Sequence, residues 1–332
     1  NALAQWLGSD DSQYVYTSGA RSRPAQLPET HDNDLQHAAF HLSGPTALGQ
    51  LTLHSGLTMH EVGDTLDATI GADSFALINP QMLEDERQYR VWDHEARLAG
   101  RLGQASWQAG VSWLVAHQSQ VATLSNAAGQ SLTVDDDHRR TTELALFGDM
   151  SLPLGGDFTL DGGGRLFRAT VREQRIVGGT TIERHRDRVG LTPTLALSWQ
   201  PDRRQMAWLR YAAASRPGGS DIGPTGELEL LDSDELQSLE AGWRRTLDGG
   251  IRLELSGWWS RWSHIQSDVL LPNGLVETVN AGTGRMRGIE LSASGRFGGD
   301  AASSGDWRWT LGATLSDARL IRTTLPFELD DN

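Results

Sequence analysis

Apolar and polar residues alternate along most of the chain, often over ten residues or more. In 189–199, for example, Val189, Leu191 and Leu195 would share one side of an extended chain, with Thr192 and Thr194 on the other. A period of two is that of a β-strand with one apolar face. The same pattern recurs in 49–60, 95–102, 107–117, 142–152, 251–262, 289–297 and 307–315. No segment shows helical periodicity. The pattern predicts an all-β chain of about thirteen strands, several longer than those of ordinary globular sheets.

The connections between these strands fall into two classes. Short turns are expected near 44–48, 101–105, 153–157, 200–203 and 247–250, and long polar links near 61–87, 118–138, 174–186, 215–233 and 266–282. The two classes alternate strictly. In an antiparallel up-and-down meander, alternate connections lie at the same end of the sheet, so one rim would be tight and the other would carry long loops. Outer-membrane barrels have this asymmetry.

The composition of the two strand faces also favours a barrel. Six aromatic residues lie near the short turns on the apolar face, as an interfacial girdle would: Trp107, Phe158, Trp199, Phe297, Trp307 and Trp309. The opposite face is too polar for a packed core, since it would carry charged residues such as Arg97, Arg165, Glu240, Glu254 and Glu290. We therefore expect an antiparallel up-and-down transmembrane β-barrel with a watery interior.

Charge and composition narrow the function. The 29 basic residues are all arginine, and with 43 acidic residues the net charge is −14, which argues against a nucleic-acid partner. The chain has no cysteine, so it has neither disulfides nor thiolate metal sites. No H-E-x-x-H or G-x-S-x-G motif is present, and no pattern indicates a cofactor. The sequence gives no support for an enzyme.

The glycine-rich stretch VNAGTGRMRGIELSASGRF, residues 279–297, resembles a dinucleotide-binding loop only superficially. Gly282 and Gly284 are followed by Gly288, one residue too late for G-x-G-x-x-G. The residues after Gly288 alternate as in a strand, whereas a phosphate loop would lead into a helix. The stretch is expected to be a barrel strand.

Several segments together resemble TonB-dependent outer-membrane receptors. They are LTPTLALSWQPDRRQMAWLRYAAASRPGG (191–219), DELQSLEAGWRRTLDGGIRLELSGWWSRWSHIQ (234–266), the Asn-Ala-Gly and Gly-hydrophobe-Glu pattern of 279–297, and DWRWTLGATLSDARL (306–320). The resemblance is strongest over 186–320 and is mostly architectural over 1–185. No one of these four segments is specific to the receptor family on its own, but the four together in the correct order are.

The resemblance implies a 22-stranded barrel filled by a plug domain. It also implies an outer-membrane location in a Gram-negative bacterium, contact with lipid and lipopolysaccharide, and uptake of a scarce nutrient, most often a ferric siderophore, with energy from TonB. We expect residues 1–332 to form a single partial barrel domain, about thirteen of the 22 strands, without the plug through which TonB would act. We expect the protein to be a monomer.

Arginines gather where strands would emerge on the long-loop side. Guanidinium groups fork onto carboxylate or catecholate oxygens, so this collar is a candidate site for an anionic ligand. Pairing with nearby acids or with lipopolysaccharide phosphates is the other interpretation. The candidate residues are Arg139, Arg140, Arg184, Arg186, Arg188, Arg216, Arg285 and Arg287.

The other clusters of charged residues and histidines do not indicate a metal site. The acidic runs 84–86, 135–137 and 232–235 lack the ligand spacing of an EF-hand and are expected to be solvated loop tips. His37 and His41 would share a strand face but lie roughly 13 Å apart, too far to bind one metal ion. We expect no metal site.

Two alternatives to a TonB-dependent receptor stay open from the sequence. The first is a soluble secreted β-protein, a propeller or sandwich, that binds carbohydrate. A propeller fits poorly, because each period of about fifty residues holds two long strands, whereas a blade has four short ones. The second is a diffusion porin, whose constriction would come from a loop folded into the channel.

Overall fold

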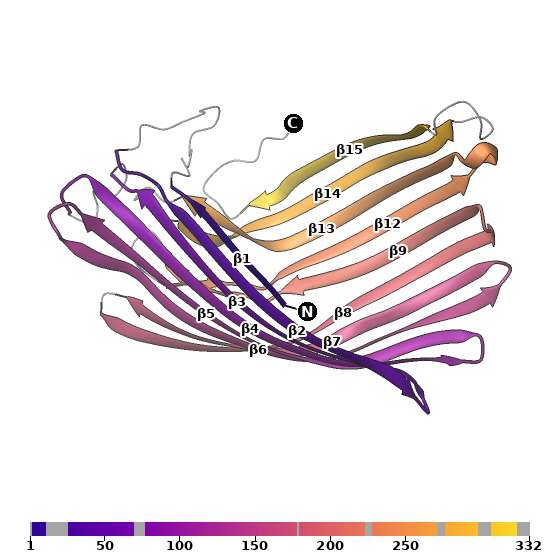
Figure 1. Ribbon diagram of the computed structural model, residues 1–332, viewed down its shortest axis with the longest axis horizontal. Helices are drawn as coiled ribbons and strands as arrows, with labels where there is room; N and C mark the ends of the chain where they lie inside the picture. Colours follow the sequence, from indigo (N-terminus) through magenta and orange to yellow (C-terminus); the bar gives the residue numbers. More distant parts are fainter. Residues whose placement is uncertain are drawn as a thin grey trace.

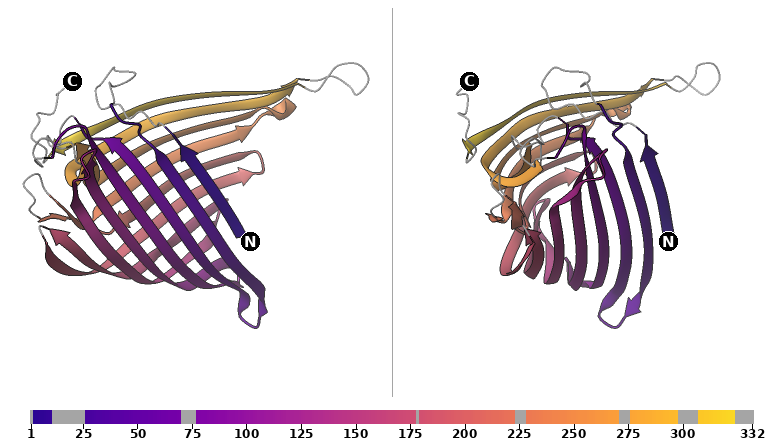
Figure 2. Two further views of the ribbon diagram at one scale, coloured as in Figure 1. Left: turned by 60° about the vertical axis from the view of Figure 1, so that its left-hand side comes forward. Right: turned by 90° about the vertical axis from the view of Figure 1, so that its left-hand side faces the viewer.

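The computed structural model contains one large curved β-sheet (Figures 1 and 2). It describes residues 2–10, 26–69, 77–177, 179–222, 228–270, 276–297 and 307–323. The strands are β1 (Ala2–Ser9), β2 (His31–Thr46), β3 (Gly49–Asp67), β4 (Gln81–Leu102), β5 (Ala105–Asn126), β6 (Ser131–Gly155), β7 (Phe158–Val177), β8 (Thr180–Asp202), β9 (Gln205–Arg216), β10 (Gly219–Ile222), β11 (Leu228–Leu231), β12 (Asp234–Thr246), β13 (Arg252–Leu270), β14 (Val276–Phe297) and β15 (Trp307–Thr323).

The sheet is an antiparallel meander of 13 strands in the order β1–β9, β12–β15, as the alternation predicts. Strands β10 and β11 form a separate hairpin. Among the described residues the only helical element is the 3-10 turn η2 (Asp248–Gly250), and no helix there is long and apolar enough to cross a membrane. The sheet is open, since its edge strands β1 and β15 each have one neighbour. This is the expected partial up-and-down barrel.

One rim of the sheet consists of tight connections. The strands on either side of residues 47–48, 103–104, 156–157 and 203–204 follow one another with almost no loop, and η2 fills the short link from β12 to β13. These positions lie within a few residues of the predicted turns. The predicted tight rim is confirmed.

The other rim differs from the prediction. Strands β5 and β6 remain paired to Ser125 and Ser131, and β7 and β8 to Val177 and Thr180, so residues 118–138 and 174–186 are mostly strand and were wrongly expected to be long loops. Outside the bilayer both faces of a sheet meet water, so apolar alternation disappears while backbone pairing continues. Only the predicted links 61–87, 215–233 and 266–282 contain a connection of several residues.

The two faces of the sheet have the compositions that the alternation predicts. The outer, convex face carries an exposed apolar band across many strands, for example Leu146, Leu166, Leu191 and Ile289, each at least half exposed. A soluble sandwich or propeller would bury such a band. The inner face carries polar and charged residues of the same strands, including Arg165 hydrogen-bonded to Glu143.

Aromatic residues border the apolar band at the tight rim. Phe158 and Trp199 pair across β7 and β8 with ring centroids 6.4 Å apart, and Trp307 is exposed on the outer face of β15. Trp107 lies at the same rim on β5. The side chain of Phe297 lies outside the described part. This arrangement is that of an interfacial girdle.

Inner-face aromatic rings lie over glycines of the neighbouring strand. Phe167 of β7 covers Gly190 of β8, and Trp208 of β9 covers Gly242 of β12 in the same way. A Cβ atom at either glycine would overlap the ring. The rings thus fill the space that the missing side chains leave, and Phe167 is only 6% exposed. This packing replaces a central core.

The stretch 279–297 lies in β14, as expected, and does not form a phosphate loop. Gly282 occupies an irregular point in its pairing with β13, with a φ of 131°. A Cβ there would overlap the carbonyl of Arg322, so the first glycine of the motif serves the backbone geometry of the sheet.

The ring-over-glycine packing gives a stability prediction. We expect Gly190→Ala to lower the free energy of unfolding by about 1–3 kcal/mol, because the new methyl group must displace the ring of Phe167. Denaturant titration of the full chain in detergent measures this change. The control is Gly312→Ala in β15, where nothing lies within 4 Å of the added Cβ. An equal loss in both variants would contradict the packing argument.

Candidate ligand-binding site

The β10–β11 hairpin lies against the inner face of the barrel wall at the rim opposite the tight turns. Nη2 of Arg139 and Nη1 of Arg175 donate to the carbonyl of Ser220, at 3.2 and 3.1 Å. The hydroxyl of Ser220 donates to Glu173, and Ser220 is almost fully buried. Residues of β6 and β7 therefore anchor one side of the hairpin.

The other side of the hairpin is fixed to β14. The carboxylate of Asp221 accepts from the backbone N–H of Thr278 at 2.6 Å. The side-chain oxygen of Asn280 accepts a hydrogen bond from the backbone N–H of Asp232 at 2.6 Å. Its side-chain nitrogen donates to the carbonyls of Asp232 and His264, at 3.1 and 2.8 Å. Asn280 belongs to the Asn-Ala-Gly pattern of the sequence. The hairpin thus spans the interior between β6–β8 and β14.

Arg175 is the centre of this anchorage. Its guanidinium forks onto Asp135, with Nε and Nη2 at 2.8 and 2.6 Å from the two oxygens, and contacts Asp221 at 2.8 Å. The side chain is 4% exposed. Burial would lower the pKa of Arg175, but the hydrogen bonds and charges of Asp135 and Asp221 raise it above its usual value. The arginine stays cationic and joins two acids that would otherwise repel.

Asp137 lies beside this network on the inner face of β6, beyond the apolar band. Burial raises the pKa of Asp137 to about 6, Arg139 lowers it, and Glu173 raises it further. Arg139 approaches Asp137 at 3.8 Å but binds Glu173 more closely, at 2.7 Å. Asp137 therefore shares Arg139 with a second acid.

The eight candidate arginines all lie toward this rim, but on two faces. By strand register, Arg139, Arg184, Arg186, Arg188 and Arg216 lie on the inner face. The remaining three, Arg140, Arg285 and Arg287, lie on the outer face. Arg287, for example, contacts Asp317 of the neighbouring strand at 3.1 Å. A soluble ligand inside the barrel could meet only the first five.

Most of the inner arginines already have partners. Arg186 donates to the carbonyl of Leu231 at 2.6 Å, and Arg188 contacts Glu235 at 2.6 Å. Arg216 contacts Asp234 at 2.7 Å. Strand β8 pairs with β9 only from Thr194 onward, so Arg186 and Arg188 bridge the gap between upper β8 and the chain beyond it.

Some guanidinium groups on the inner wall keep unused hydrogen-bond donors. Buried N–H groups of Arg139 (Nε), Arg184 (Nε) and Arg188 (Nη1) have no partner in the described part of the chain. Buried polar groups without partners are rare and costly. A hollow of about 480 Å³ lies between Arg186, Arg188 and the residues that flank the hairpin. These guanidinium groups therefore keep hydrogen-bonding capacity that the described part of the chain does not use.

The sequence missed the residues that build this site. The run 135–137 is not a loop tip, as was expected, because Asp135 and Asp137 lie in β6 and face inward. Glu173, Arg175 and Ser220 carried no motif. In the sequence these residues stood out only as polar or charged positions in segments expected to be loops. Charge alone does not predict which residue of another strand a side chain will contact.

Within the described ranges, no three His, Asp or Glu side chains come together in a way that could hold a metal ion. His31 contacts Asp64 at 2.7 Å, and His37 bonds to the hydroxyl of Thr58 at 3.0 Å.

The model of the family described as "TonB dependent receptor-like, beta-barrel" matches residues 3–329. The chain belongs to the TonB-dependent receptor β-barrel family. This family comprises receptors and transporters of the outer membrane of Gram-negative bacteria. The partial barrel, its exposed apolar band and its tight rim agree with this membership.

Solved receptors share the fold at low sequence identity. The ferric yersiniabactin uptake receptor FyuA from Yersinia pestis matches with a TM-score of 0.75 and 15% identity, over 96% of this chain and 48% of that one. The siderophore receptor PiuA from Acinetobacter baumannii gives 0.65 and 12%, over 97% and 55%. The copper transporter OprC gives 0.67 and 13%, over 88% and 48%. A search of curated proteins found no match.

These likenesses concern the fold alone, and the chain spans about half the length of each of these structures. Their names differ in cargo, since two concern siderophores and one concerns copper. The architecture is therefore shared among proteins whose named cargoes differ.

Removal of the central arginine should release the hairpin. In Arg175→Met, Asp135 and Asp221 lose their shared cation, a loss that costs about 3–5 kcal/mol for buried pairs. We expect amide hydrogen exchange in 219–222 and 228–231 to accelerate at least tenfold, while exchange in β7 and β8 near the tight rim stays unchanged.

The matched control for this variant is Arg172→Met, three residues earlier on β7 and on the opposite face. Arg172 is exposed on the outer face and contacts no part of the hairpin. If Arg175→Met leaves exchange in the hairpin unchanged, the contacts to β14 hold it and the role given to Arg175 is wrong.

The raised pKa of Asp137 predicts a pH dependence of stability. Its folded pKa of about 6 lies above the ordinary 3.8, so the folded state binds more protons between these values. The free energy of unfolding therefore falls as pH rises from about 4 to 6. We expect Asp137→Asn to reduce this fall and to stabilise the protein at pH 7 by about 1–3 kcal/mol.

Denaturant titrations of the full chain at pH 4.5 and 7.5 measure this difference. Asp248→Asn is the control, since Asp248 is exposed at the tight rim and its partner Arg204, at 2.6 Å, stays charged at both pH values. An unchanged pH profile in Asp137→Asn would refute the assignment.

Proposed function

We propose that this chain forms part of an outer-membrane TonB-dependent receptor that imports a scarce nutrient, a ferric siderophore of anionic type. The observation that carries the proposal is the inner arginine wall, where Arg139, Arg184 and Arg188 each keep an unused guanidinium N–H group. Family membership and the two siderophore-receptor neighbours support it.

The inner wall suits an anionic chelate for a physical reason. Arg184 lies on the inner face and has no ion pair within the described part of the chain, so its charge is available to a ligand. Carboxylate or catecholate oxygens accept bidentate hydrogen bonds from guanidinium groups, and low local dielectric strengthens such contacts. An uncharged ligand would gain little binding energy from these arginines.

The hairpin gives the wall a second role. Because β10–β11 spans the interior between Arg175 and Asn280, a ligand that enters from this rim meets the hairpin first. We infer that the ligand rests against the hairpin and the arginines of β6–β8 before it passes inward. Release toward the periplasm would require the plug and TonB, which act in the whole receptor.

Uptake of iron from defined chelates tests the proposal. Cells that lack other receptors and express the whole receptor should accumulate radioactive iron from a ferric tris-catecholate, a trianion, but not from an uncharged ferric tris-hydroxamate. Deletion of TonB should abolish accumulation. We expect Arg184→Gln to weaken binding of the tris-catecholate about tenfold or more, the effect of one lost charged hydrogen bond.

Arg203→Gln, which removes one exposed arginine at the tight rim, serves as the control. Equal uptake of both chelates would contradict an anionic siderophore as cargo. TonB-independent uptake would instead favour the porin interpretation, for which a hairpin inside the barrel would be the constriction. The soluble carbohydrate-binding alternative has no support from the exposed apolar band.

A further inference from the structure

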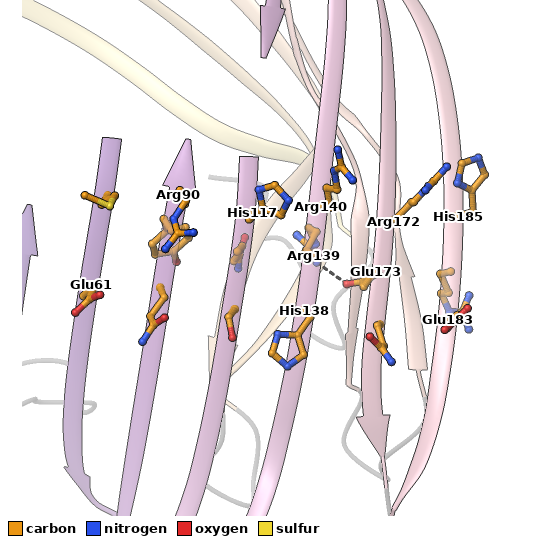
Figure 3. Close-up of a pocket in the computed structure, with 17 residues that line it drawn as sticks. Glu61, Arg90, His117, His138, Arg139, Arg140, Arg172, Glu173, Glu183 and His185 are labelled. Carbon is orange, nitrogen blue, oxygen red and sulfur yellow. Dashed lines mark hydrogen bonds and ion pairs between the residues drawn. The ribbon is translucent and has the colours of Figure 1, made fainter. Parts of the chain in front are cut away.

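The upper part of β8 has one edge along which no other strand pairs. On one side, β8 pairs with β7 from Thr180 onward. On the other side, its pairing with β9 begins only at Thr194. Residues 181–191 therefore form a strand edge without a neighbour in the described part of the chain, and we name it the free edge of β8. Figure 3 shows this part of the strand, with Glu183 and His185.

Strand register identifies the backbone groups that the free edge presents. The N–H of Gln200 donates to the carbonyl of Asp157 at 2.9 Å, and the pairing of β7 with β8 has no register shift. Successive residues of a strand direct their backbone groups to opposite neighbours. Even-numbered residues of β8 therefore bond to β7, and the odd-numbered residues of 181–191 direct their N–H and C=O groups to the unoccupied side.

Two prolines explain why β9 does not cover this edge. Pro193 is an odd-numbered residue of β8, so it has no N–H to donate to β9, and the pairing ends beside it at Thr194. Pro217 directly follows Arg216, the last residue of β9, and the chain then turns into the β10–β11 hairpin. The gap between upper β8 and the chain beyond it is thus encoded in the sequence.

The gap has room for a single strand. The hollow of about 480 Å³ is lined by residues 185–188 on the β8 side and by residues 217–218 and 232–233 on the far side. Because chain bounds it on both sides, it suits one extended segment better than a folded domain. At its lower end the free edge reaches Leu191 of the apolar band, where lipid offers no hydrogen bonds and unpaired backbone groups are costly.

The charge beside the free edge indicates what would occupy it. Its inner-face neighbours are Arg184, Arg186 and Arg188, and buried N–H groups of Arg184 and Arg188 have no partner in the described part of the chain. An added strand would place every second side chain against these arginines, where acidic residues would accept their unused hydrogen bonds. A second copy paired at the same edge would instead set arginine against arginine, which is unfavourable.

We propose that the free edge of β8 binds one extended peptide by antiparallel strand addition, with acidic residues of the peptide at alternate positions facing the arginines. Main-chain hydrogen bonds supply affinity in this mode of recognition, and the alternate side chains supply specificity. The bound peptide closes the gap in the barrel wall. This peptide site is additional to the siderophore uptake proposed above and does not depend on it.

Synthetic peptides test the proposal. The full chain in phosphatidylcholine nanodiscs is titrated with a fluorescent, amidated peptide of four Glu-Val repeats, and binding is measured by anisotropy. We expect lysine in place of glutamate to weaken binding at least tenfold, because the arginines repel it. N-methylation of the valines, whose N–H groups would face β8, should weaken it as much, since it removes the donors of the ladder. Bound peptide should slow amide hydrogen exchange in 181–191 and leave β13 unchanged.

Two substitutions at one position test the role of the backbone. His185→Pro removes one N–H of the free edge without loss of a bond to β7, and should weaken binding at least fivefold. The matched control, His185→Thr, keeps that N–H and should bind within about twofold of the unaltered chain. Circular dichroism checks that both variants keep their sheet.

Equal binding by the two His185 variants would overturn the proposal. So would absence of binding, equal binding of the lysine or N-methylated peptide, or protection of the sheet edges β1 and β15 instead of 181–191. Iron uptake is not measured, so the peptide site and the proposed cargo can fail separately.

Discussion

Backbone hydrogen bonding is the constraint on which the structure depends. Within a bilayer each unpaired N–H or C=O costs several kcal/mol, so a chain that crosses repeatedly by strands must pair every strand with its neighbours. The continuous ladder from β1 through β9 and β12 to β15 meets this condition for every strand between the two edges, apart from the upper part of β8. Side chains are then free to differ on the two faces. The apolar band, the polar interior and the aromatic rim follow from that freedom.

Because successive residues of a strand point to opposite faces of the sheet, arginines that are neighbours in sequence have different surroundings. Arg139 and Arg140 are neighbours in sequence, yet the first binds Glu173 inside the barrel and the second is exposed on the outer face. The inner arginines are mostly neutralised and hold a hairpin, while outer ones are exposed. A lysine-free chain thus places arginine on both faces of the sheet, and on the inner face it forms structural ion pairs.

The hairpin illustrates how a polar interior is organised without a hydrophobic core. Buried apolar residues form only small clusters, such as Ala145, Phe167 and Ala169. At the rim opposite the tight turns, ion pairs around Arg175 and hydrogen bonds from the side-chain amide of Asn280 hold the chain in place, as apolar packing does elsewhere. Such a network has directional contacts and a charge state that depends on pH.

The sequence by itself determined the all-β class, the strand number, the tight rim and the membership of the barrel family. These depend on the period of apolar residues and on short-range turn chemistry, both of which are local. Tertiary structure decided where the polar segments go. Residues 118–138 and 174–186 remain strands because pairing continues where alternation has ended. It also decided which arginines face inward and which acids they meet. Ion pairs between residues 40 or more positions apart, such as Arg175 with Asp135 and Asp221, depend on the register of distant strands, which no local pattern encodes.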